Sequence, residues 1–392
     1  MKVLLLGGTG VFGQDAAGLL ADSNLVTEIA IASRRLEAAQ EVASELDAKG
    51  RAVSVDIKDQ RRLTSIASEY DIVVNAAGPT FEVQLPALRA VIEAGTHYCD
   101  LGIDGDTMET ALQLDPQARD AAVTAVLGIG LDPGLSNLLA VHAVQQLDET
   151  EELLVCLFDH MATMGTLSPE PALARARESG QVDTSFQDIL LIAQGPAITY
   201  REGRWVRVQP MENPVEVDLP SGQTVTAYPV STSEPVTLPR YLPGVKNVST
   251  LFSFFPPQLN ELYFHHGRRI AEGEIDPAGA GLSFLEEVVA DQARWLSGPT
   301  GFPTGWTMWV TATGLKDGRR VRYSCWPHAL PTSTNGALVA CTLRILSGQV
   351  DRHGVLPPEA CLEPQAFFAD VVKVRPSTTE GPLLGETLQY LD

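Results

Sequence analysis

A run of glycines near the start of the chain has the spacing of a turn that binds a dinucleotide. Gly8, Gly10 and Gly13 follow the pattern G-x-G-x-x-G, between an apolar run at 3–6 and a helix-like stretch at 14–20. The first glycine permits a tight strand-to-helix turn, the second lets the backbone approach a pyrophosphate, and the third lets the helix pack on the strand. The positive end of that helix then faces the phosphates. We expect this turn to bind a cofactor through Gly8, Thr9, Gly10, Val11, Phe12 and Gly13.

The end of the second strand indicates which dinucleotide is bound. A site for NAD usually offers an acidic residue about 20 residues beyond the glycines, to bind the ribose 2′-hydroxyl. This chain has Ser33, Arg34 and Arg35 there, after an apolar strand at 28–32. A hydroxyl and guanidinium groups suit a 2′-phosphate, so we favour NADP(H). The alternative is that both arginines are solvated at a helix start, where cations are unfavourable unless an anion binds.

Two further strand ends are candidates for contact with the same cofactor. A third strand at 52–57 ends in Asp56 and Ile57. Asp56 meets the adenine ring or caps the next turn, and the sequence leaves both interpretations open. A fourth strand at 71–78 runs into a loop of small residues that would pass under the cofactor, although small residues also suit tight packing. The loop residues that we expect to bind are Ala76, Ala77 and Gly78.

Three polar side chains at strand ends are candidates for catalysis. Hydride transfer belongs to the nicotinamide, so the protein must hold the reacting carbon and supply or remove a proton. Tyr98 and Asp100 end a fifth strand at 97–101, and Asp132 follows a sixth at 124–130. Ligands of parallel sheets bind beyond the carboxyl ends of the strands. Asp132 is the first candidate, and its alternative is a turn-forming Asp before proline.

The elements that position these residues alternate between strand and helix. Such alternation predicts an α/β fold with a Rossmann-type, doubly wound parallel sheet. One helix is expected at 84–94, with Pro86 in its first turn, where proline is tolerated. We expect this dinucleotide-binding domain to span residues 1–131.

Beyond Asp132 the pattern changes to short, polar-punctuated segments. They predict a second α+β domain at 132–334 with a largely antiparallel sheet, including a hairpin that turns at 316–318. Residues 169–180 are expected to form a loop. A C-terminal segment at 335–392 returns to helix, the last one near 364–372.

Composition narrows the class of protein. At 392 residues, the chain is too long for one ordinary hydrophobic core, so we expect two domains. Apolar residues make up 44% of the chain, as in globular proteins, and the formal net charge is −21. This charge argues against a nucleic-acid or anionic-membrane partner, because either usually needs a basic face. The five cysteines form no C-x-x-C pair, so we expect no metal site and a reducing, cytoplasmic location. No apolar run approaches the ~20 residues of a membrane helix.

Three separated stretches resemble the saccharopine dehydrogenase family, in its shorter NADP-dependent branch. They are the glycine turn with Ala32-Ser33-Arg34-Arg35, the turn at 129–135 that resembles the family's G-x-D-P-G, and the segment 348–359 that resembles its closing G-x-x-P-E. The resemblance implies a Rossmann domain, a second, dimer-forming domain and a C-terminal segment that returns to the first. It also implies interconversion of a secondary amine with an amine and a carbonyl compound, through an imine that accepts hydride. Known substrates of the family include saccharopine, carboxynorspermidine and lysine.

The resemblance also indicates residues for a small amine or carbonyl substrate. In the G-x-D-P-G turn, Asp132 would stabilise or protonate the imine, with Pro133 and Gly134 beside the substrate. Arg240 lies in a further family-like segment and is a candidate clamp for an anionic group. His160 ends the first strand of the second domain and is a weaker candidate, because a lone histidine is more often structural.

Three interpretations of function follow. The first is an NADP-dependent oxidoreductase that reduces an imine or oxidises an amine, acting as a homodimer. The second is a reductase of a carbon–carbon or carbonyl double bond on the same fold, since the Gly-Gly-Thr-Gly turn is common there. The third is a regulatory protein that senses NADP(H) without turnover.

Overall fold

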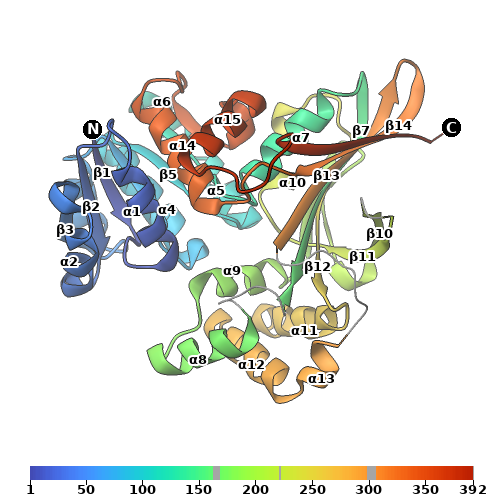
Figure 1. Ribbon diagram of the computed structural model, residues 1–392, viewed down its shortest axis with the longest axis horizontal. Helices are drawn as coiled ribbons and strands as arrows, with labels where there is room; N and C mark the ends of the chain where they lie inside the picture. Colours follow the sequence, from blue (N-terminus) through green and yellow to red (C-terminus); the bar gives the residue numbers. More distant parts are fainter. Residues whose placement is uncertain (162–167, 220–221, 298–305, 392) are drawn as a thin grey trace. The chain divides into compact units, whose positions relative to one another are not determined.

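The computed structural model describes residues 1–161, 168–219, 222–297 and 306–391. The chain divides into two compact units, which are coloured along the sequence in Figure 1. The first unit comprises residues 1–142 and 327–385, and the second comprises residues 143–326 and 386–392. The sequence places the divisions after residues 131 and 334 instead.

The sheet of the first unit is parallel throughout, with strand order β15-β6-β5-β4-β1-β2-β3 (Figure 1). This order confirms the predicted Rossmann-type fold. Val355 pairs with Ala125, so the C-terminal segment returns to this sheet, as the resemblance implied. The strands are β1 (Lys2–Leu6), β2 (Glu28–Ser33), β3 (Gly50–Ser54), β4 (Ile72–Asn75), β5 (His97–Asp100), β6 (Thr124–Val126) and β15 (Gly354–Leu356).

Helices connect these strands and pack in two groups. Helix α1 contacts α14, which also contacts β4, β5 and α15, whereas α3 contacts α4. The helices are α1 (Val11–Ala21), α2 (Leu36–Ser44), η1 (Asp47–Lys49), α3 (Gln60–Ala67), α4 (Thr80–Ala94), α5 (Gly105–Leu112), α6 (Asp115–Asp120), α7 (Leu135–Val144), α14 (Thr334–Leu346), η5 (Pro358–Ala360) and α15 (Pro364–Val374).

The predicted start of helix α4, at residue 84, was wrong. The helix begins at Thr80, directly after the extended residue Pro79, so Pro86 lies inside the helix and not in its first turn. Proline inside a helix removes one backbone hydrogen bond and crowds the carbonyl four residues earlier, although its fixed φ suits a helix. Ala87, Leu88, Ala90 and Val91 are buried, and this packing outweighs the lost bond.

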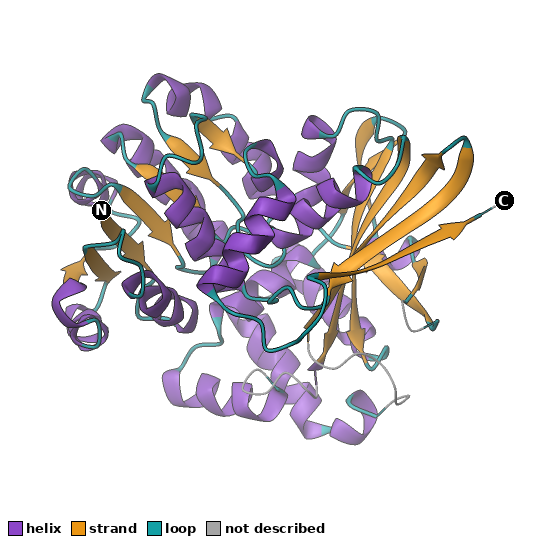
Figure 2. Ribbon diagram, turned by 45° about the horizontal axis from the view of Figure 1, so that its top comes forward, coloured by secondary structure: helices purple, strands orange, loops and turns teal. Residues whose placement is uncertain are grey.

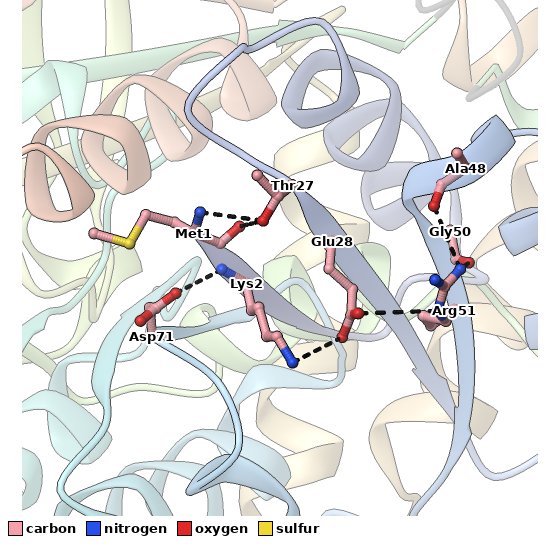
Figure 3. A network of polar contacts seen from close by, with 8 residues as sticks. All are labelled: Met1, Lys2, Thr27, Glu28, Ala48, Gly50, Arg51 and Asp71. Atoms are coloured by element: carbon pink, nitrogen blue, oxygen red, sulfur yellow. Dashed lines mark hydrogen bonds and ion pairs between the residues drawn. The ribbon is translucent and has the colours of Figure 1, made fainter.

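A polar network lies at the amino ends of β1 to β4, and Figure 3 shows its residues. The backbone N–H of Lys2 donates to Asp71 Oδ2 at 2.6 Å. Glu28 lies 3.8 Å from Lys2 Nζ and 3.9 Å from Arg51 Nε. Lys2, Glu28 and Arg51 lie at the starts of β1, β2 and β3, and Asp71 directly precedes β4, so the network links four neighbouring strands at the ends away from the site.

The second unit has a mixed sheet of order β10-β11-β12-β7-β13-β14-β16, to which β8 is added by pairing with β12 and β9 by pairing with β8. The predicted hairpin turn is confirmed, because Asp317 and Gly318 have φ of 52° and 72°. The pair β7 and β12 is parallel, and the strand β16 was not predicted. The strands are β7 (Glu149–His160), β8 (Ala197–Arg201), β9 (Arg204–Val208), β10 (Val215–Asp218), β11 (Thr224–Pro229), β12 (Asn247–Phe255), β13 (Trp306–Lys316), β14 (Arg319–Pro327) and β16 (Leu384–Tyr390).

Helices of the second unit pack on one another and on β12. Figure 2 draws the helices in purple and the strands in orange. They bury Phe254 against Tyr263 and Phe284. The predicted loop at 169–180 was wrong, because a helix starts with Pro169 at its first position and ends before Gly180 at φ 72°. The helices are α8 (Pro169–Ser179), α9 (Thr184–Ile192), η4 (Pro210–Glu212), α10 (Glu234–Tyr241), α11 (Leu259–Ala271), α12 (Pro277–Ala290) and α13 (Gln292–Trp295). Among the described helices of both units, none has the length and apolarity that a membrane crossing requires.

Candidate active site

The glycine turn closes tightly against two neighbouring segments. Gly7 has φ of 72°, and a Cβ there would lie 2.5 Å from the backbone N of Ala77. A Cβ on Gly13 would lie 2.1 Å from the carbonyl oxygen of Gly7. These two glycines are therefore required by the fold itself. The structure also brings the turn against the loop that begins at Ala76, two predicted site segments that are far apart in the sequence.

Gly10 differs from its neighbours because its surface is open. It is exposed, and a Cβ there would meet only the Gly7 carbonyl at 3.4 Å, an ordinary contact. Gly10 is the N-cap of α1 and has no side-chain cap, so the positive end of the helix is uncovered. The apolar Val11 beside it is 75% exposed. An open glycine at an uncapped helix N-terminus fits a pyrophosphate.

The predicted 2′-phosphate site lies at the end of β2. Ser33 Oγ accepts a hydrogen bond from the Arg35 N–H at 3.2 Å, which shapes the turn into α2. Arg34 and Arg35 are exposed, and within the described residues neither guanidinium has a hydrogen bond or ion pair. Two uncommitted cations at a helix start are available to an anionic ligand, so these residues fit a 2′-phosphate.

Asp56 and Ile57 follow β3 at the next strand end. Asp56 is exposed, and its Oδ1 accepts from the backbone N–H of Lys58 at 2.9 Å. The structure thus shows the turn-capping role that the sequence left open. Ile57 is half-buried. Contact of either residue with adenine stays a prediction.

The loop after β4 is held by a residue that the sequence did not single out. Asn75 Oδ1 accepts from the Ala77 N–H at 3.0 Å, and Asn75 Nδ2 donates to the Tyr98 hydroxyl at 2.9 Å. The Ala76 N–H donates to the carbonyl of Leu6. Asn75 therefore fixes the predicted cofactor loop, Ala76 to Gly78, against β1 and β5. An asparagine at a strand end was the only sequence signal for this role.

Tyr98 and Asp100 lie in the interior and not on an open surface. Tyr98 is fully buried, and burial and the nearby Asp100 raise its pKa well above the usual range. Asp100 is 1% exposed, and its Oδ1 accepts from the backbone N–H groups of Gly102 at 3.0 Å and Gly128 at 2.8 Å. Burial raises the pKa of Asp100, and these two donors partly oppose the shift. Both side chains hold loops in place.

Asp132 stands at the tip of a tight turn that follows β6. The Gly130 N–H donates to the Pro133 carbonyl at 2.8 Å, and the Leu135 N–H donates to the Gly130 carbonyl at 3.0 Å. Gly134 has φ of 126°, and a Cβ there would lie 2.3 Å from the Gly130 carbonyl oxygen. The turn therefore requires glycine at this position. Asp132 is half-buried, whereas Pro133 and Gly134 are buried.

A second asparagine connects this turn to the closing segment of the family-like sequence. Asn137 Oδ1 accepts from the Gly134 N–H at 3.0 Å, and Asn137 Nδ2 donates to Glu359 Oε2 at 2.9 Å. Two of the stretches that carry the resemblance thus meet within the first unit. Neither Asn137 nor Glu359 was predicted as a site residue.

The two substrate candidates in the second unit have local partners. The Arg240 guanidinium lies 4.3 Å from the centre of the Trp205 ring, and its Nη1 donates to the Val236 carbonyl. His160 is half-buried at the end of β7, beside Phe255 in the sheet register. The adjacent Asp159 is 1% exposed, and burial raises its pKa well above the usual range.

Comparison with known proteins finds a matching family model, several relatives and a solved structure of similar fold. Residues 3–126 match the family described as "Saccharopine dehydrogenase NADP binding domain". A carboxynorspermidine synthase from Vibrio alginolyticus is 24% identical, over 94% of this chain and 94% of its own. A trans-acting enoyl reductase from Mycobacterium tuberculosis is 30% identical, over 38% of each chain. The solved saccharopine dehydrogenase (L-Glu forming) from Saccharomyces cerevisiae has a TM-score of 0.66 at 16% identity and covers 99% of both chains, which shows a shared fold.

The Rossmann sheet, its open glycine turn and the matched domain define an NADP-binding oxidoreductase. Its cofactor is NADP(H), as the arginines after β2 predicted. Residues 3–126 match the saccharopine dehydrogenase NADP-binding domain family, and this match confirms the resemblance found in the sequence.

Proposed function

We propose that this protein acts on carbon–nitrogen bonds, reducing an imine formed from an amine and a carbonyl compound, or catalysing the reverse oxidation. The observation that carries the proposal is the match to a carboxynorspermidine synthase over 94% of both chains. A relative that matched the cofactor-binding domain alone would support only the assignment of the cofactor, and not the reaction. A match of this extent also includes the second unit. The family resemblance implies that this unit is the substrate domain.

The chain's own residues support the chemistry in separate roles. The bound nicotinamide supplies the hydride. Asp132, half-buried at the tip of its turn, is proposed to stabilise or protonate the imine nitrogen, because a carboxylate favours a neighbouring positive charge. Pro133 and Gly134 shape that turn and are proposed to lie beside the substrate. Tyr98 and Asp100 are proposed as positioning residues, since both are buried and hold loops.

His160 and Arg240 remain proposed substrate contacts. The stacking of Arg240 on Trp205 already engages its guanidinium. A substrate anion would have to bind at the edge of that stack. The homodimer and the cytoplasmic location are likewise proposals, and sedimentation analysis of the purified chain tests the first.

Substitution of Asp132 tests the catalytic proposal. Asp132→Ala should lower turnover of an amine and carbonyl pair by about 10²–10⁴-fold, the usual contribution of a positioned acid or base. NADPH affinity, followed by nicotinamide fluorescence, should stay nearly unchanged. Asp120→Ala, on an exposed residue at the end of α6, is the matched control. Wild-type turnover in Asp132→Ala would remove Asp132 from the mechanism.

A second candidate function has a specific observation in its favour. The relative with the higher identity, 30% over 38% of each chain, is a trans-acting enoyl reductase. Reduction of a carbon–carbon double bond is therefore the alternative. Product analysis separates the two, because a new carbon–nitrogen bond supports the imine reaction and a saturated alkene product supports the other.

A further inference from the structure

The N-terminus of α14 presents backbone donors that the protein leaves unused. The helix has 13 residues and begins at Thr334. Ser333 caps it, since Ser333 Oγ accepts from the Gly336 N–H at 3.0 Å and the Ser333 carbonyl accepts from the Ala337 N–H. Within the described part of the chain, the N–H groups of Thr334 and Asn335 have no acceptor. Such groups at a helix start usually find a partner in a side chain, water or ligand.

A buried acceptor lies beside these donors. Asn335 is 6% exposed, and its Nδ2 donates to Asp15 Oδ2 at 2.6 Å, so the orientation of the amide is fixed. Its Oδ1 is buried and accepts no hydrogen bond from the described residues. A buried polar atom without a partner costs about 1–3 kcal/mol, so this atom is built for a donor that the chain itself does not supply.

The position of this pair points to the cofactor. Asp15 lies on α1, about one helical turn after the glycine-rich loop that fits the pyrophosphate. On the other side, a Cβ on Gly130 would lie 3.2 Å from Thr334 Cγ2, which places Thr334 against the turn that carries Asp132. Helix α14 also contacts β4 and β5. In a Rossmann sheet the nicotinamide half of the dinucleotide continues from the first turn toward these later strands.

We propose that the N-terminus of α14 holds the carboxamide of the nicotinamide. Asn335 Oδ1 accepts from the carboxamide NH₂, and the backbone N–H groups of Thr334 and Asn335 donate to its carbonyl oxygen. A carboxylate would suit the two donors but would face the Asn335 oxygen, another acceptor. A carboxamide carries both a donor and an acceptor and matches the whole set. Asn335 thereby fixes the rotation of the ring, which decides which face of the nicotinamide meets the substrate.

The test uses an analogue that lacks the donor. Reduced 3-acetylpyridine adenine dinucleotide phosphate has a methyl group where NADPH has the amide NH₂, whereas adenosine 2′,5′-bisphosphate lacks the nicotinamide half. Binding of all three to the full chain is measured by calorimetry, with no turnover required. The wild type should bind the analogue about tenfold more weakly than NADPH, the effect of one hydrogen bond. Asn335→Ala should bind NADPH and the analogue alike, with adenosine 2′,5′-bisphosphate within about twofold of the wild type.

Two variants separate ligand contact from altered packing. Thr334→Pro removes one backbone donor at the first helical position, where proline is tolerated. The preceding residue, Ser333, already has the extended conformation that proline requires, with φ of −120° and ψ of 111°. Thr334→Pro should weaken NADPH and the analogue by an equal factor, because both retain the carbonyl. Arg375→Ala removes the ion pair of Arg375 with Asp15 at 2.5 Å and should leave the preference for NADPH over the analogue unchanged.

Several outcomes would overturn the proposal. These are equal affinity of the wild type for NADPH and the analogue, an unchanged preference in Asn335→Ala, or wild-type NADPH affinity in Thr334→Pro. The proposal rests on the NADP(H) assignment and not on the imine reaction. If the wild type bound neither NADPH nor adenosine 2′,5′-bisphosphate, the cofactor assignment itself would fail and this inference with it.

Discussion

Asn137 Nδ2 donates a 2.9 Å hydrogen bond to Glu359 Oε2, joining two turns that are 222 residues apart in the chain. Asn137 is fully buried, and its Oδ1 simultaneously accepts from the Gly134 N–H. A side chain near a helix start that bonds back to the preceding backbone N–H is half of a capping box. Through this one residue the closing segment of the chain holds the turn that presents Asp132.

Asn137→Ala should destabilise the protein by about 2 kcal/mol, because it leaves both a buried backbone donor and a carboxylate oxygen of the half-buried Glu359 without this partner. The shift in the urea midpoint, followed by circular dichroism, measures the loss. Glu359→Gln keeps an acceptor and should cost less. In the Asn137→Ala background, Glu359→Gln should cost less still, because the carboxylate has already lost its donor. Strict additivity of the two substitutions would show that the bond carries no coupling energy.

Arg34→Ala should weaken NADPH binding about 10–100-fold, the range for a charge-assisted hydrogen bond to phosphate. NADH affinity should change little, because NADH lacks the 2′-phosphate. Nicotinamide fluorescence titrations with both cofactors measure the two affinities. Arg89→Ala, on an exposed arginine of α4, is the charge-matched control. Equal weakening of NADPH and NADH would mean that Arg34 does not contact the phosphate.

Local patterns made the fold and the cofactor turn predictable. The strand, glycine turn and helix at residues 2–21 are encoded by neighbouring residues, and so is the hairpin at Asp317 and Gly318. Long-range contacts were not predictable. Asn75 acquires its role only because β4 pairs with β5 and brings it to Tyr98, and nothing in the sequence around Asn75 specifies that neighbour.

Tertiary packing also explains where the element predictions failed. The segment 169–180 contains two prolines near its start and reads as a loop, yet α8 packs on α12 and buries Leu173 and Ala176. Burial of one apolar stripe can stabilise a helix whose local signals are weak. Tyr98 and Asp100 were likewise chosen because they end a strand, and the sequence does not show whether a strand end is exposed or buried. The structure buries both side chains, and their catalytic role stays a prediction.

Tyr98→Phe should change how stability depends on alkaline pH. Burial raises the pKa of Tyr98 well above 10, whereas the unfolded chain ionises near pH 10. Below pH 10 both states are protonated and the stabilisation is complete, and above it the unfolded state loses the proton and stability falls. The variant should be about 1 kcal/mol less stable at pH 7, since Asn75 loses its acceptor, but should lose less between pH 10 and 11.5. Thermal midpoints measure both effects, with the exposed Tyr390→Phe as control; parallel curves for Tyr98→Phe and the wild type would contradict the burial argument.

The glycines of the first turn should separate into two kinds when each is changed to alanine. Gly13→Ala should cost about 1–3 kcal/mol of stability, because its Cβ would lie 2.1 Å from the Gly7 carbonyl oxygen. Gly10→Ala has room in the fold and should keep a wild-type melting temperature while losing NADPH affinity, since its Cβ would occupy the surface that faces the phosphates.

Gly18→Ala, in the same helix, completes this series as the control. A Cβ at Gly18 meets nothing within 4 Å, so this variant should gain about 0.5–1 kcal/mol from helix propensity and bind NADPH normally. Melting temperatures and NADPH titrations of the three variants distinguish steric need from ligand contact. Normal NADPH affinity in Gly10→Ala would move the pyrophosphate away from the N-terminus of α1, because a methyl group at that position cannot coexist with a phosphate on the same backbone.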